Sequence, residues 1–360
     1  MLLGSTLGRY FSLLYLRTMA VVFATVFGLV YVVDFLQIAH DSSESKDSLA
    51  VLAGLALLRT PALTEQALPF AVLLGAMGAL LVLNRRLELV VARAAGVSAW
   101  QFLQPGILVA GLIGLATVTL YNPLGSALSR KAAALETRLL DDSHRKQLVQ
   151  IFLRQTGHDG QAIIQAGSSV ANTTRLMRVT IFTFDKAGAF EDRIEAREAV
   201  FRDGYWELRD ARVLNERDEP QDFSRYLLAS HLEPAHVRQT LTEAEAVGFW
   251  DLPDAIAQAE RAGLDPTRYR LQFDVLLARP FLFVVMILVA ASVCLKLFRL
   301  GGVRRLAAGG ISAGFGLYVV TRLTEKLGIS GLLGPAAAAW FPVLLGSLLG
   351  SLALLYQEDG

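Results

Sequence analysis

The sequence predicts an α-helical membrane protein with six transmembrane helices and a β-rich domain, of the sandwich or barrel type, inserted between the third and fourth helices. Three observations lead to this fold class. Hydrophobic residues make up 53% of the 360 residues and charged residues only 19%, whereas average globular chains are about 25% charged. The apolar residues are gathered into long runs on both sides of a polar middle section. That middle section changes from a helical to a two-residue hydrophobic period.

Six apolar runs are candidates for membrane spans, because a helix needs about 20 mostly apolar residues to cross the hydrocarbon core. The first run contains one acid, Asp34, near its far end, and is too long for the apolar core of a cleaved signal peptide. A shorter run at 49–58 is expected to extend the second helix or to pack beside it, with a break near Pro61. The six predicted spans are 19–36, 63–83, 102–121, 276–295, 306–321 and 336–355.

Basic residues in the short loops predict the orientation of the chain in the membrane. Lys and Arg gather in cytoplasmic loops, and they are frequent before the first span, at 84–101 and at 296–305. They are sparse in the loops at 37–48 and 322–334. Both termini are therefore expected in the cytoplasm and the middle domain outside. The basic residues that carry this argument are Arg9, Arg17, Arg85, Arg86, Arg93, Lys296, Arg299, Arg304 and Arg305.

The middle of the chain, from about 147 to 241, shows the alternation of β-strands. Strand-like runs follow one another at intervals typical of an all-β sandwich or barrel. The Asp203-Gly204 pair between two β-rich runs is a strong hairpin signal. The predicted strands are 147–154, 160–166, 178–184 and the two arms of 193–214. One face of the first arm is expected to carry Ile194, Ala196 and Val200, interrupted by Glu198, and one face of the second arm Trp206 and Leu208.

Helical stretches flank this β-rich section. Residues 124–140 are expected to continue the third span outward. A second helix is expected at 251–263, with Asp251 as a candidate N-cap and Pro253 in the first turn. The predicted domains are then 1–122 with the first three spans, 123–270 with the β-rich domain and its flanking helices, and 271–360 with the last three spans.

Several function classes are excluded by what the sequence lacks. The 34 Lys and Arg against 33 Asp and Glu give a net charge of +1, which provides no basic field for a nucleic acid. The lone cysteine, Cys294, excludes an internal disulfide and is expected to act as a small hydrophobic residue of a span. There is no P-loop, H-E-x-x-H or G-x-S-x-G motif. We therefore expect no catalytic residue, no metal and no cofactor, and nucleotide hydrolysis only by another chain.

The cytoplasmic loop at 84–98 has the most distinctive pattern outside the spans. Its apolar residues fall at i, i+3, i+4 and i+7, which is one face of a helix, and we expect this helix at about 84–97. Such a helix is suited to insert into a groove of a cytoplasmic partner, or to rest in the lipid headgroup layer. The pattern alone favours neither. The apolar face is Leu87, Val90, Val91 and Ala94, and its polar surroundings are Arg85, Arg86, Glu88 and Arg93.

A second set of candidate residues is basic and lies near the predicted outer membrane surface. Arg59 precedes Pro61, and Arg130 and Lys131 follow the third span. Guanidinium and ammonium groups form charge-assisted hydrogen bonds with phosphates, so these residues are candidates for binding an anionic lipid. The alternative is that they extend to the headgroup layer without specific binding.

The layout and several segments resemble the LptF/LptG (YjgP/YjgQ) family of lipopolysaccharide export permeases over essentially the whole chain. The most specific segments are LPFAVLLGAMGALLVLNRRLELVVARAAGVS, AVFRDGYWELRDARV and DLPDAIAQAERAGLDPTRYRLQFDVLLARPF. The last of these is more similar to LptG than to LptF. The alternatives are an LptF-type paralogue or, from another class, a mechanotransmission subunit of the FtsX/MacB kind, which usually has four spans.

The resemblance implies a role in a multiprotein complex. One LptG-like and one LptF-like chain pair in the inner membrane, and a dimeric ATPase of the LptB kind binds beneath them. The pair extracts lipopolysaccharide into a cavity between the two chains. The outside domain is then a β-jellyroll that passes the acyl chains to an LptC-like bridge protein.

The resemblance also assigns roles to individual residues. The helix at 84–97 matches the family's coupling helix, with Glu88 in its acidic position, and Arg130 matches a basic position that meets lipid phosphates. Two other family basic positions hold Tyr31 and Ala62 here, which leaves two alternatives: Arg59 or Lys131 compensates, or the native lipid carries less phosphate. The candidates for the apolar slot of the jellyroll, which periodicity alone does not distinguish from sandwich core, are Val149, Ile151, Leu153, Val179, Ile181 and Trp206.

Overall fold

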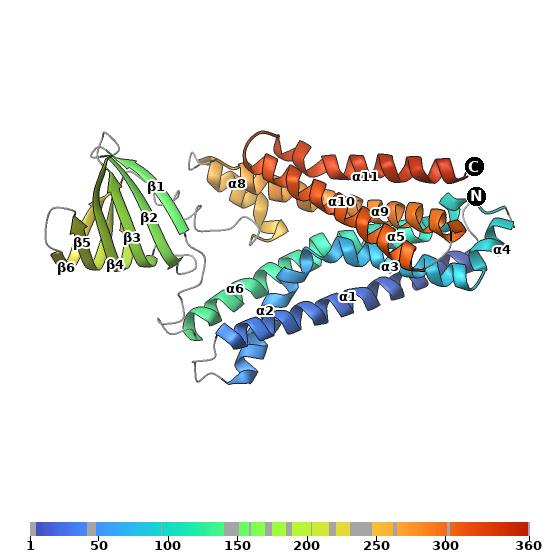
Figure 1. Cartoon of the computed structure of the whole chain (residues 1–360), viewed down its shortest axis with the longest axis horizontal. Helices are drawn as coiled ribbons and strands as arrows, with labels where there is room; N and C mark the ends of the chain where they lie inside the picture. The colour runs from blue at the N-terminus through green and yellow to red at the C-terminus, as the bar shows by residue number, and fades with distance from the viewer. Residues whose placement is uncertain are drawn as a thin grey trace.

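The computed structural model consists of a helix bundle with a β-sheet domain at one end (Figure 1). The N and C marks lie at the other end of the bundle, beside the short helix α4. We call these two ends the sheet end and the terminal end. The structure describes residues 5–41, 48–94, 96–139, 151–157, 160–169, 175–184, 189–202, 204–215, 221–230, 247–261, 265–300 and 303–358.

The first half of the bundle consists of α1 (Ser5–Asp41), α2 (Leu49–Glu65), α3 (Leu68–Arg85), α4 (Glu88–Ala94), α5 (Ala99–Ala116) and α6 (Asn122–Leu139). A single π-helical turn, η1 (Thr117–Tyr121), joins α5 to α6 without a break. The prediction that the third span continues outward as a helix is thereby confirmed. A capping box between Ser98 and Gln101 begins α5, so the start of this span is set by side-chain hydrogen bonds to the first turn.

The break between the first apolar segments differs from the expectation. Helix α2 continues through Pro61 and ends at Glu65, and the second span, α3, begins only at Leu68. Around the proline, the hydroxyls of Thr60 and Thr64 donate to the carbonyls of Ala56 and Thr60, both at 2.7 Å. Such side-chain hydrogen bonds help a helix to tolerate proline. The predicted break near Pro61 is therefore wrong, and the chain turns at Gln66 and Ala67 instead.

The second half of the bundle consists of α9 (Thr267–Leu300), α10 (Val303–Ile329) and α11 (Pro335–Glu358). Within the described residues, five helices are long and apolar enough to cross a membrane. They contain the predicted spans at 19–36, 102–121, 276–295 and 336–355, and they overlap the predicted span at 63–83 from residue 68 on. The five segments are Thr6–His40, Leu68–Arg85, Ala99–Leu135, Thr267–Leu295 and Pro335–Tyr356.

The sixth predicted span, 306–321, falls within α10, which is not among these five. A methyl group at Gly310 would collide with Met77, and one at Gly314 with Leu73, both on α3. Glycines at these two positions allow α10 and α3 to approach closely.

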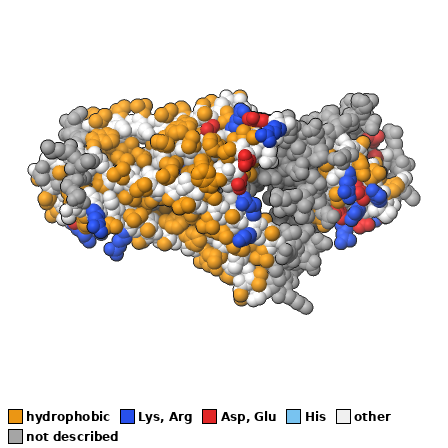
Figure 2. Space-filling model, turned by 180° about the vertical axis from the view of Figure 1, so that it is seen from behind, with side chains coloured by type: hydrophobic (Ala, Val, Ile, Leu, Met, Phe, Trp, Pro, Cys, Tyr) orange, Lys and Arg blue, Asp and Glu red, His pale blue; other side chains and the backbone are white. Residues whose placement is uncertain are grey.

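The surface of the bundle is predominantly apolar. Hydrophobic side chains cover it in Figure 2, and charged side chains gather towards its two ends. Its interior is a core from α1, α3, α5 and α9 that includes Tyr15, Leu80, Phe102 and Phe283. An apolar belt between two charged zones is the surface that a bilayer requires.

The inserted domain contains an antiparallel sheet of six strands in the order β1-β2-β3-β4-β5-β6. The strands are β1 (Ile151–Gly157), β2 (Gly160–Ser169), β3 (Arg175–Phe184), β4 (Phe190–Arg202), β5 (Tyr205–Asn215) and β6 (Gln221–Ala229). An antiparallel β domain between the two groups of helices is confirmed. Among the described strands each pairs with its neighbours in sequence, without the Greek-key crossing that defines a jellyroll. Strand β6 was not predicted.

The hairpin between β4 and β5 is confirmed. Arg202 pairs with Tyr205 across the turn, and Gly204 has a φ of 86°, which glycine adopts without strain. Asp203 lies outside the described residues. Trp206 and Leu208 share the buried face of β5, as expected.

The buried face of β4 differs from the prediction. It changes parity after Ala196 and continues at Ala199 and Phe201, not at Val200. The paired residues pass from Ala196–Ala211 to Glu198–Arg209, and in the intervening row Asp210 has a φ of 51°. This local irregularity changes which side chains face the core. Glu198 therefore does not interrupt the apolar face.

The chain returns from the sheet to the bundle through a short 3₁₀ turn, η4 (Phe249–Asp251), and α8 (Leu252–Arg261). Helix α8 begins directly after Asp251 with Pro253 in its first turn, as the sequence indicated. Leu252 is fully buried and packs with Tyr269 and Leu276 of α9. This packing ties the returning segment to the start of α9.

Candidate functional site

At the terminal end of the bundle, α4 presents apolar side chains to solvent. Leu87, Val90 and Val91 are 62%, 55% and 67% exposed, whereas Leu89 is only 5% exposed and belongs to the bundle core. Ala94 is also exposed. The face predicted to bind a partner is thus exposed within this chain. Leu89, on the opposite side, holds the helix against the bundle.

The helix that carries this face is shorter than predicted. Residues 84 and 85 belong to the end of α3, and α4 contains only seven residues, Glu88–Ala94. Between the two helices, Leu87 has a φ of 57°, a left-handed conformation that costs a non-glycine residue about 1–2 kcal/mol. This turn separates α4 from the axis of α3. The expected single helix over 84–97 is therefore corrected to two helices joined at Arg86 and Leu87.

The acidic residue of this segment, Glu88, is held by the start of α1. The Tyr10 hydroxyl donates to Glu88 Oε1 at 3.1 Å and accepts from Arg86 Nη1 at 2.9 Å. Arg86 also lies 3.8 Å from Glu88. Arg85 is exposed beside this cluster. The polar side of α4 is thus fixed to the bundle while the apolar side is exposed.

The four residues predicted to bind lipid lie on α1, α2 and α6, near one another in a small sub-bundle at the sheet end (Figure 1). Tyr31 packs at the edge of its core, which contains Ile38, Leu52, Leu55, Ala56 and Ala132. Arg130 and Lys131 directly precede Ala132, and both are exposed. The structure therefore places the candidates on one sub-bundle, although they come from segments far apart in sequence.

Two of these basic residues contact carboxylates of the same chain. Arg59 Nη2 lies 3.7 Å from Asp34 Oδ1, and Asp34 is buried. Arg130 Nη1 lies 3.9 Å from Asp251 Oδ2, at the turn that returns from the sheet domain. Tyr31 stacks on Phe35 with ring centres 6.4 Å apart. An anionic ligand at Arg130 would compete with Asp251, whereas Lys131 offers an exposed ammonium group.

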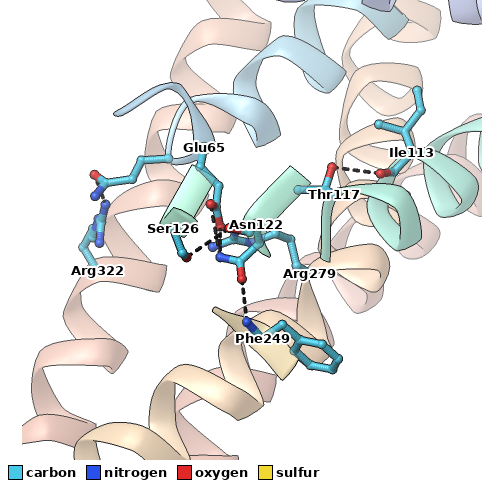
Figure 3. A network of polar contacts seen from close by, with 9 residues as sticks. Glu65, Ile113, Thr117, Asn122, Ser126, Phe249, Arg279 and Arg322 are labelled. Carbon is cyan, nitrogen blue, oxygen red and sulfur yellow. Dashed lines mark hydrogen bonds and ion pairs between the residues drawn. The ribbon is translucent and has the colours of Figure 1, made fainter. Parts of the chain in front are cut away.

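A buried polar network, which the sequence analysis missed, joins α2, α6 and α9 (Figure 3). Glu65 at the end of α2 receives hydrogen bonds from Arg279 of α9 and from Asn122 Nδ2, the latter at 2.9 and 3.2 Å. Asn122 Oδ1 accepts from the backbone N–H of Phe249 at 2.8 Å. Glu65 and Asn122 are both buried. We call Glu65, Asn122, Arg279 and the Phe249 N–H the junction network.

A second arginine holds the same turn. Arg322 of α10 donates to Gln66 Oε1 at 2.6 Å and to Glu325 Oε2 at 3.0 Å. The α2–α3 turn is therefore held by Arg279 through Glu65 and by Arg322 through Gln66 (Figure 3). A signal for this was present in the sequence, because ionisable residues inside apolar segments are often paired and functional.

The junction network also joins the segments that lead to and from the sheet domain. Besides the bond from Phe249 to Asn122, Trp250 Nε1 donates to the carbonyl of Thr119 in the π-helical turn at 3.1 Å. Phe249 stacks on Phe273 of α9 with ring centres 5.4 Å apart. Single π-turns within α-helices are frequent at functional sites. Here the turn presents a carbonyl to the returning chain.

Of the residues predicted for the apolar slot, the structure brings Val179, Ile181 and Trp206 onto one buried face of the sheet. Val149 lies outside the described residues, and Ile151 and Leu153 belong to β1, whose side chains are not described. Trp206 packs edge-on against Phe201 with ring centres 4.9 Å apart. Its buried indole N–H has no acceptor among the described residues. Such a donor costs about 1–3 kcal/mol when unpaired.

Two carboxyl groups outside the membrane-spanning segments have lowered pKa values. A hydrogen bond from the Thr267 hydroxyl, with a second from its backbone N–H, lowers the pKa of Asp265. Hydrogen bonding to Arg212 lowers the pKa of Asp222 on the sheet. The first carboxylate holds the beginning of α9, and the second joins β5 to β6. Both groups are structural.

The described residues contain no group of His, Cys, Asp and Glu side chains arranged to hold a metal ion. Glu65, Asn122 and Arg279 of the bundle are paired with one another in structural contacts, and the exposed surface of α4 is apolar. The presence of five candidate spans does not support the four-span mechanotransmission alternative.

A comparison with known protein families identifies one match. Residues 9–357 match the family described as "Lipopolysaccharide export system permease LptF/LptG". No curated protein sequence matches the chain significantly. The family match covers nearly the whole chain, including the bundle and the inserted sheet. The chain therefore belongs to the LptF/LptG family of permeases, the non-catalytic, multi-pass inner-membrane subunits of the lipopolysaccharide export system.

Proposed function

We propose that this chain is the LptG-type permease of its export system. It pairs with an LptF-like chain, and an LptB-like ATPase dimer binds its α4 surface. Both termini lie in the cytoplasm, the β domain lies in the periplasm, and α10 forms the sixth span. In this arrangement, residues 1–122 and 271–360 form the membrane part and residues 123–270 the periplasmic part. The LptG assignment is supported by the segment that forms η4, α8 and the start of α9.

The observation that carries the ATPase contact is the exposed apolar face of α4. Leu87, Val90 and Val91 are exposed at the terminal end, as far from the sheet domain as the bundle allows. Fully burying one such side chain stabilises a contact by about 1.5–3 kcal/mol. A groove on the ATPase would supply that burial, and ATP-driven movement of the groove would then be transmitted to α3 and α5 through α4.

The lipid route begins at the sub-bundle of α1, α2 and α6. Arg130, Lys131 and Arg59 supply cations for the lipid phosphates, and Tyr31 packs beside them. Lipopolysaccharide does not leave the bilayer unaided, because each buried CH₂ stabilises it there by about 0.8 kcal/mol. Lipid phosphate at Arg130 replaces Asp251, which links lipid binding to the segment that returns from the sheet domain.

The apolar face of the sheet then receives the acyl chains and passes them to an LptC-like protein. Trp206 supports this role, because its buried indole N–H lacks a protein acceptor among the described residues and is suited to donate to an acyl carbonyl. Completion of the described sheet to a β-jellyroll would enclose this face as a slot. The junction network holds together the helix that leads towards the sheet domain and the segment that returns from it.

The test is co-purification with an LptB-like ATPase. Leu87→Asp and Glu88→Lys should each reduce recovery of the ATPase about tenfold or more. The first places a charge on the exposed apolar face, and the second reverses the charge at the acidic position. Leu332→Asp is the matched control, since Leu332 is 75% exposed between α10 and α11. This control should bind normally. Normal ATPase recovery with both α4 variants would refute the assignment.

A further inference from the structure

Three arginines gather round one buried carboxylate on the sheet. Glu207 of β5 is only 9% exposed, and Arg225 Nε, Arg202 Nε and Arg209 Nε lie 3.1, 3.5 and 3.9 Å from its oxygens. The three arginine side chains are themselves about half exposed. They shield Glu207 from solvent while keeping much of their own surface accessible.

This cluster lies on the face opposite the apolar slot. Glu207 stands between Trp206 and Leu208, whose side chains point to the buried face, and successive residues of a strand alternate between faces. Arg209 is two residues farther along β5 and pairs directly with Arg225 of β6. Arg202 pairs with Tyr205 at the β4–β5 turn. The arginines are therefore on the outer face, and Arg225 lies on β6, the edge strand of the described sheet.

The way in which the arginines contact Glu207 leaves hydrogen-bond donors available. Arg202 and Arg225 approach the carboxylate through Nε. Among the described residues, neither donates a hydrogen bond through its terminal amino groups, whereas Arg209 Nη1 lies 3.5 Å from Glu198. The terminal part of a guanidinium carries four of its five N–H donors and matches the oxygens of a phosphate or carboxylate. Glu207 thus positions two guanidinium groups without occupying them fully.

A nearby pair on the same sheet shows the contrast. Arg212 contacts Asp222 through both Nε, at 2.7 Å, and Nη2, at 3.0 Å. Its exposure resembles that of Arg202, but a carboxylate engages its guanidinium bidentately. Among the described residues, the cluster around Glu207 contains three arginines against two carboxylates, Glu207 and Glu198.

We propose that Arg202 and Arg225 form an anion-binding site for a phosphate group on the sugar part of the transported glycolipid. The inference rests on the proposed function. An amphiphile with acyl chains and phosphorylated sugars matches a sheet with one apolar and one arginine-bearing face. Strand β6 is the last strand of the described sheet, so the ligand reaches both faces by passing round this edge. Glu207 is the positioning residue of the site.

The experiment uses photo-crosslinking in the full chain within its export complex in membranes. A benzoyl-phenylalanine at Leu227, which pairs with Glu207 and is 55% exposed, reports on the outer face. A second reporter at Tyr226, which packs against the apolar cluster, reports on the slot. The probe is lipopolysaccharide with phosphorylated core sugars. Lipopolysaccharide with the same acyl chains but without core phosphates is the comparison.

The double variant Arg202→Gln, Arg225→Gln should reduce ATP-dependent crosslinking at Leu227 about tenfold, because two charge-assisted contacts are lost. Crosslinking at Tyr226 should remain. Removing the core phosphates should reproduce this loss in the unchanged chain. The matched control Arg212→Gln should leave both crosslinks intact, because Asp222 already occupies that guanidinium.

Three outcomes would overturn the proposal: equal crosslinking at Leu227 with and without core phosphates, an unchanged crosslink in the double variant, or a protein crosslinked at Leu227 in place of lipid. In each case a retained ATP-dependent crosslink at Tyr226 would leave the proposed export function standing. Loss of lipid crosslinks at Tyr226 in the unchanged chain would instead count against the export route itself. The two failures are therefore distinguishable.

Discussion

The two ends of the helix bundle differ in which kind of side chain they bury and which they expose. At the sheet end, charged and polar groups are buried and paired, with Glu65 receiving hydrogen bonds from Asn122 and Arg279. At the terminal end, apolar side chains of α4 are exposed, with Val91 67% accessible. Removing one partner of a buried ion pair strongly destabilises the fold, because the other charge is left buried and unpaired. An exposed apolar side chain contributes stabilising free energy only when another surface buries it. The first end is therefore built as a fixed joint and the second as a surface for association.

The largest expected effect breaks the joint. Arg279→Leu should destabilise the bundle by about 3–5 kcal/mol, because it leaves the buried Glu65 carboxylate without its cation. Replacing both residues, as Glu65→Leu with Arg279→Met, should cost far less, since no unpaired charge remains buried. Cys294 is the sole cysteine and is buried, so its reaction with a thiol-specific dye during heating measures unfolding directly. Equal losses for the single and the double variant would contradict the fixed-joint interpretation.

The next effect separates the two sides of α4. Leu89→Ala should destabilise the chain by about 2–3 kcal/mol, because Leu89 is part of the bundle core. Val91→Ala should change stability by less than about 0.5 kcal/mol, since the side chain is exposed. The same Cys294 assay measures both. If Val91→Ala proved as destabilising as Leu89→Ala, the exposed face would belong to the bundle and not to a partner.

A smaller effect is expected from Tyr10→Phe. This variant removes the hydrogen bonds to Glu88 and from Arg86, which are exposed and together stabilise the anchoring of α4 by about 1 kcal/mol. Protection of the α4 backbone amides from hydrogen exchange should fall about fivefold. The amides of α6 serve as an internal control and should be unaffected. Unchanged α4 protection would show that Leu89 alone holds the helix.

The smallest effect is a pH dependence on the sheet, where an exposed ion pair contrasts with the buried one. Hydrogen bonding to Arg212 lowers the pKa of Asp222 in the folded state. Its stabilising contribution is then present above the unfolded pKa of about 3.9 and is lost as the pH falls through the folded value. In that pH window, the unchanged chain should lose its greater hydrogen-exchange protection of β5 and β6 relative to Asp222→Asn. A difference that is independent of pH would rule out this linkage.

The sequence predicted the features that follow from hydrophobic periodicity and turn chemistry. It did not predict contacts between particular residues far apart in the chain. The apolar runs, the flanking helices and the hairpin at Gly204 follow local rules of period and turn chemistry, and the structure confirms them. The α4 face was found because its residues share a helical spacing. The break at Pro61 and the continuous buried face past Glu198 were mispredicted, since tertiary contacts and an irregular row in the sheet overrode local preference.

The junction network shows why the buried polar contacts of the candidate site were not predictable from the sequence. Along the chain, Glu65 is separated by 57 positions from Asn122 and by 214 positions from Arg279. Glu65 and Asn122 are single polar residues near the ends of apolar segments, where an interfacial position is the ordinary expectation. Arg279 lies inside the predicted fourth span, which indicates that it has a partner but not which residue the partner is. Only the packing of α2, α6 and α9 brings them together. Likewise, the role of Arg225 could not be inferred, because β6 itself was not predicted.

The order of the strands has a consequence for biogenesis. Each described strand pairs with the strand before or after it in the chain, so the sheet forms through contacts of short sequence separation. Such contacts form quickly, because little chain entropy is lost in closing the intervening loops. The described sheet can therefore form before α9, α10 and α11 have been synthesised. The Asn122–Phe249 bond closes a loop of 127 positions, and it requires residue 249, which is synthesised after all the described strands.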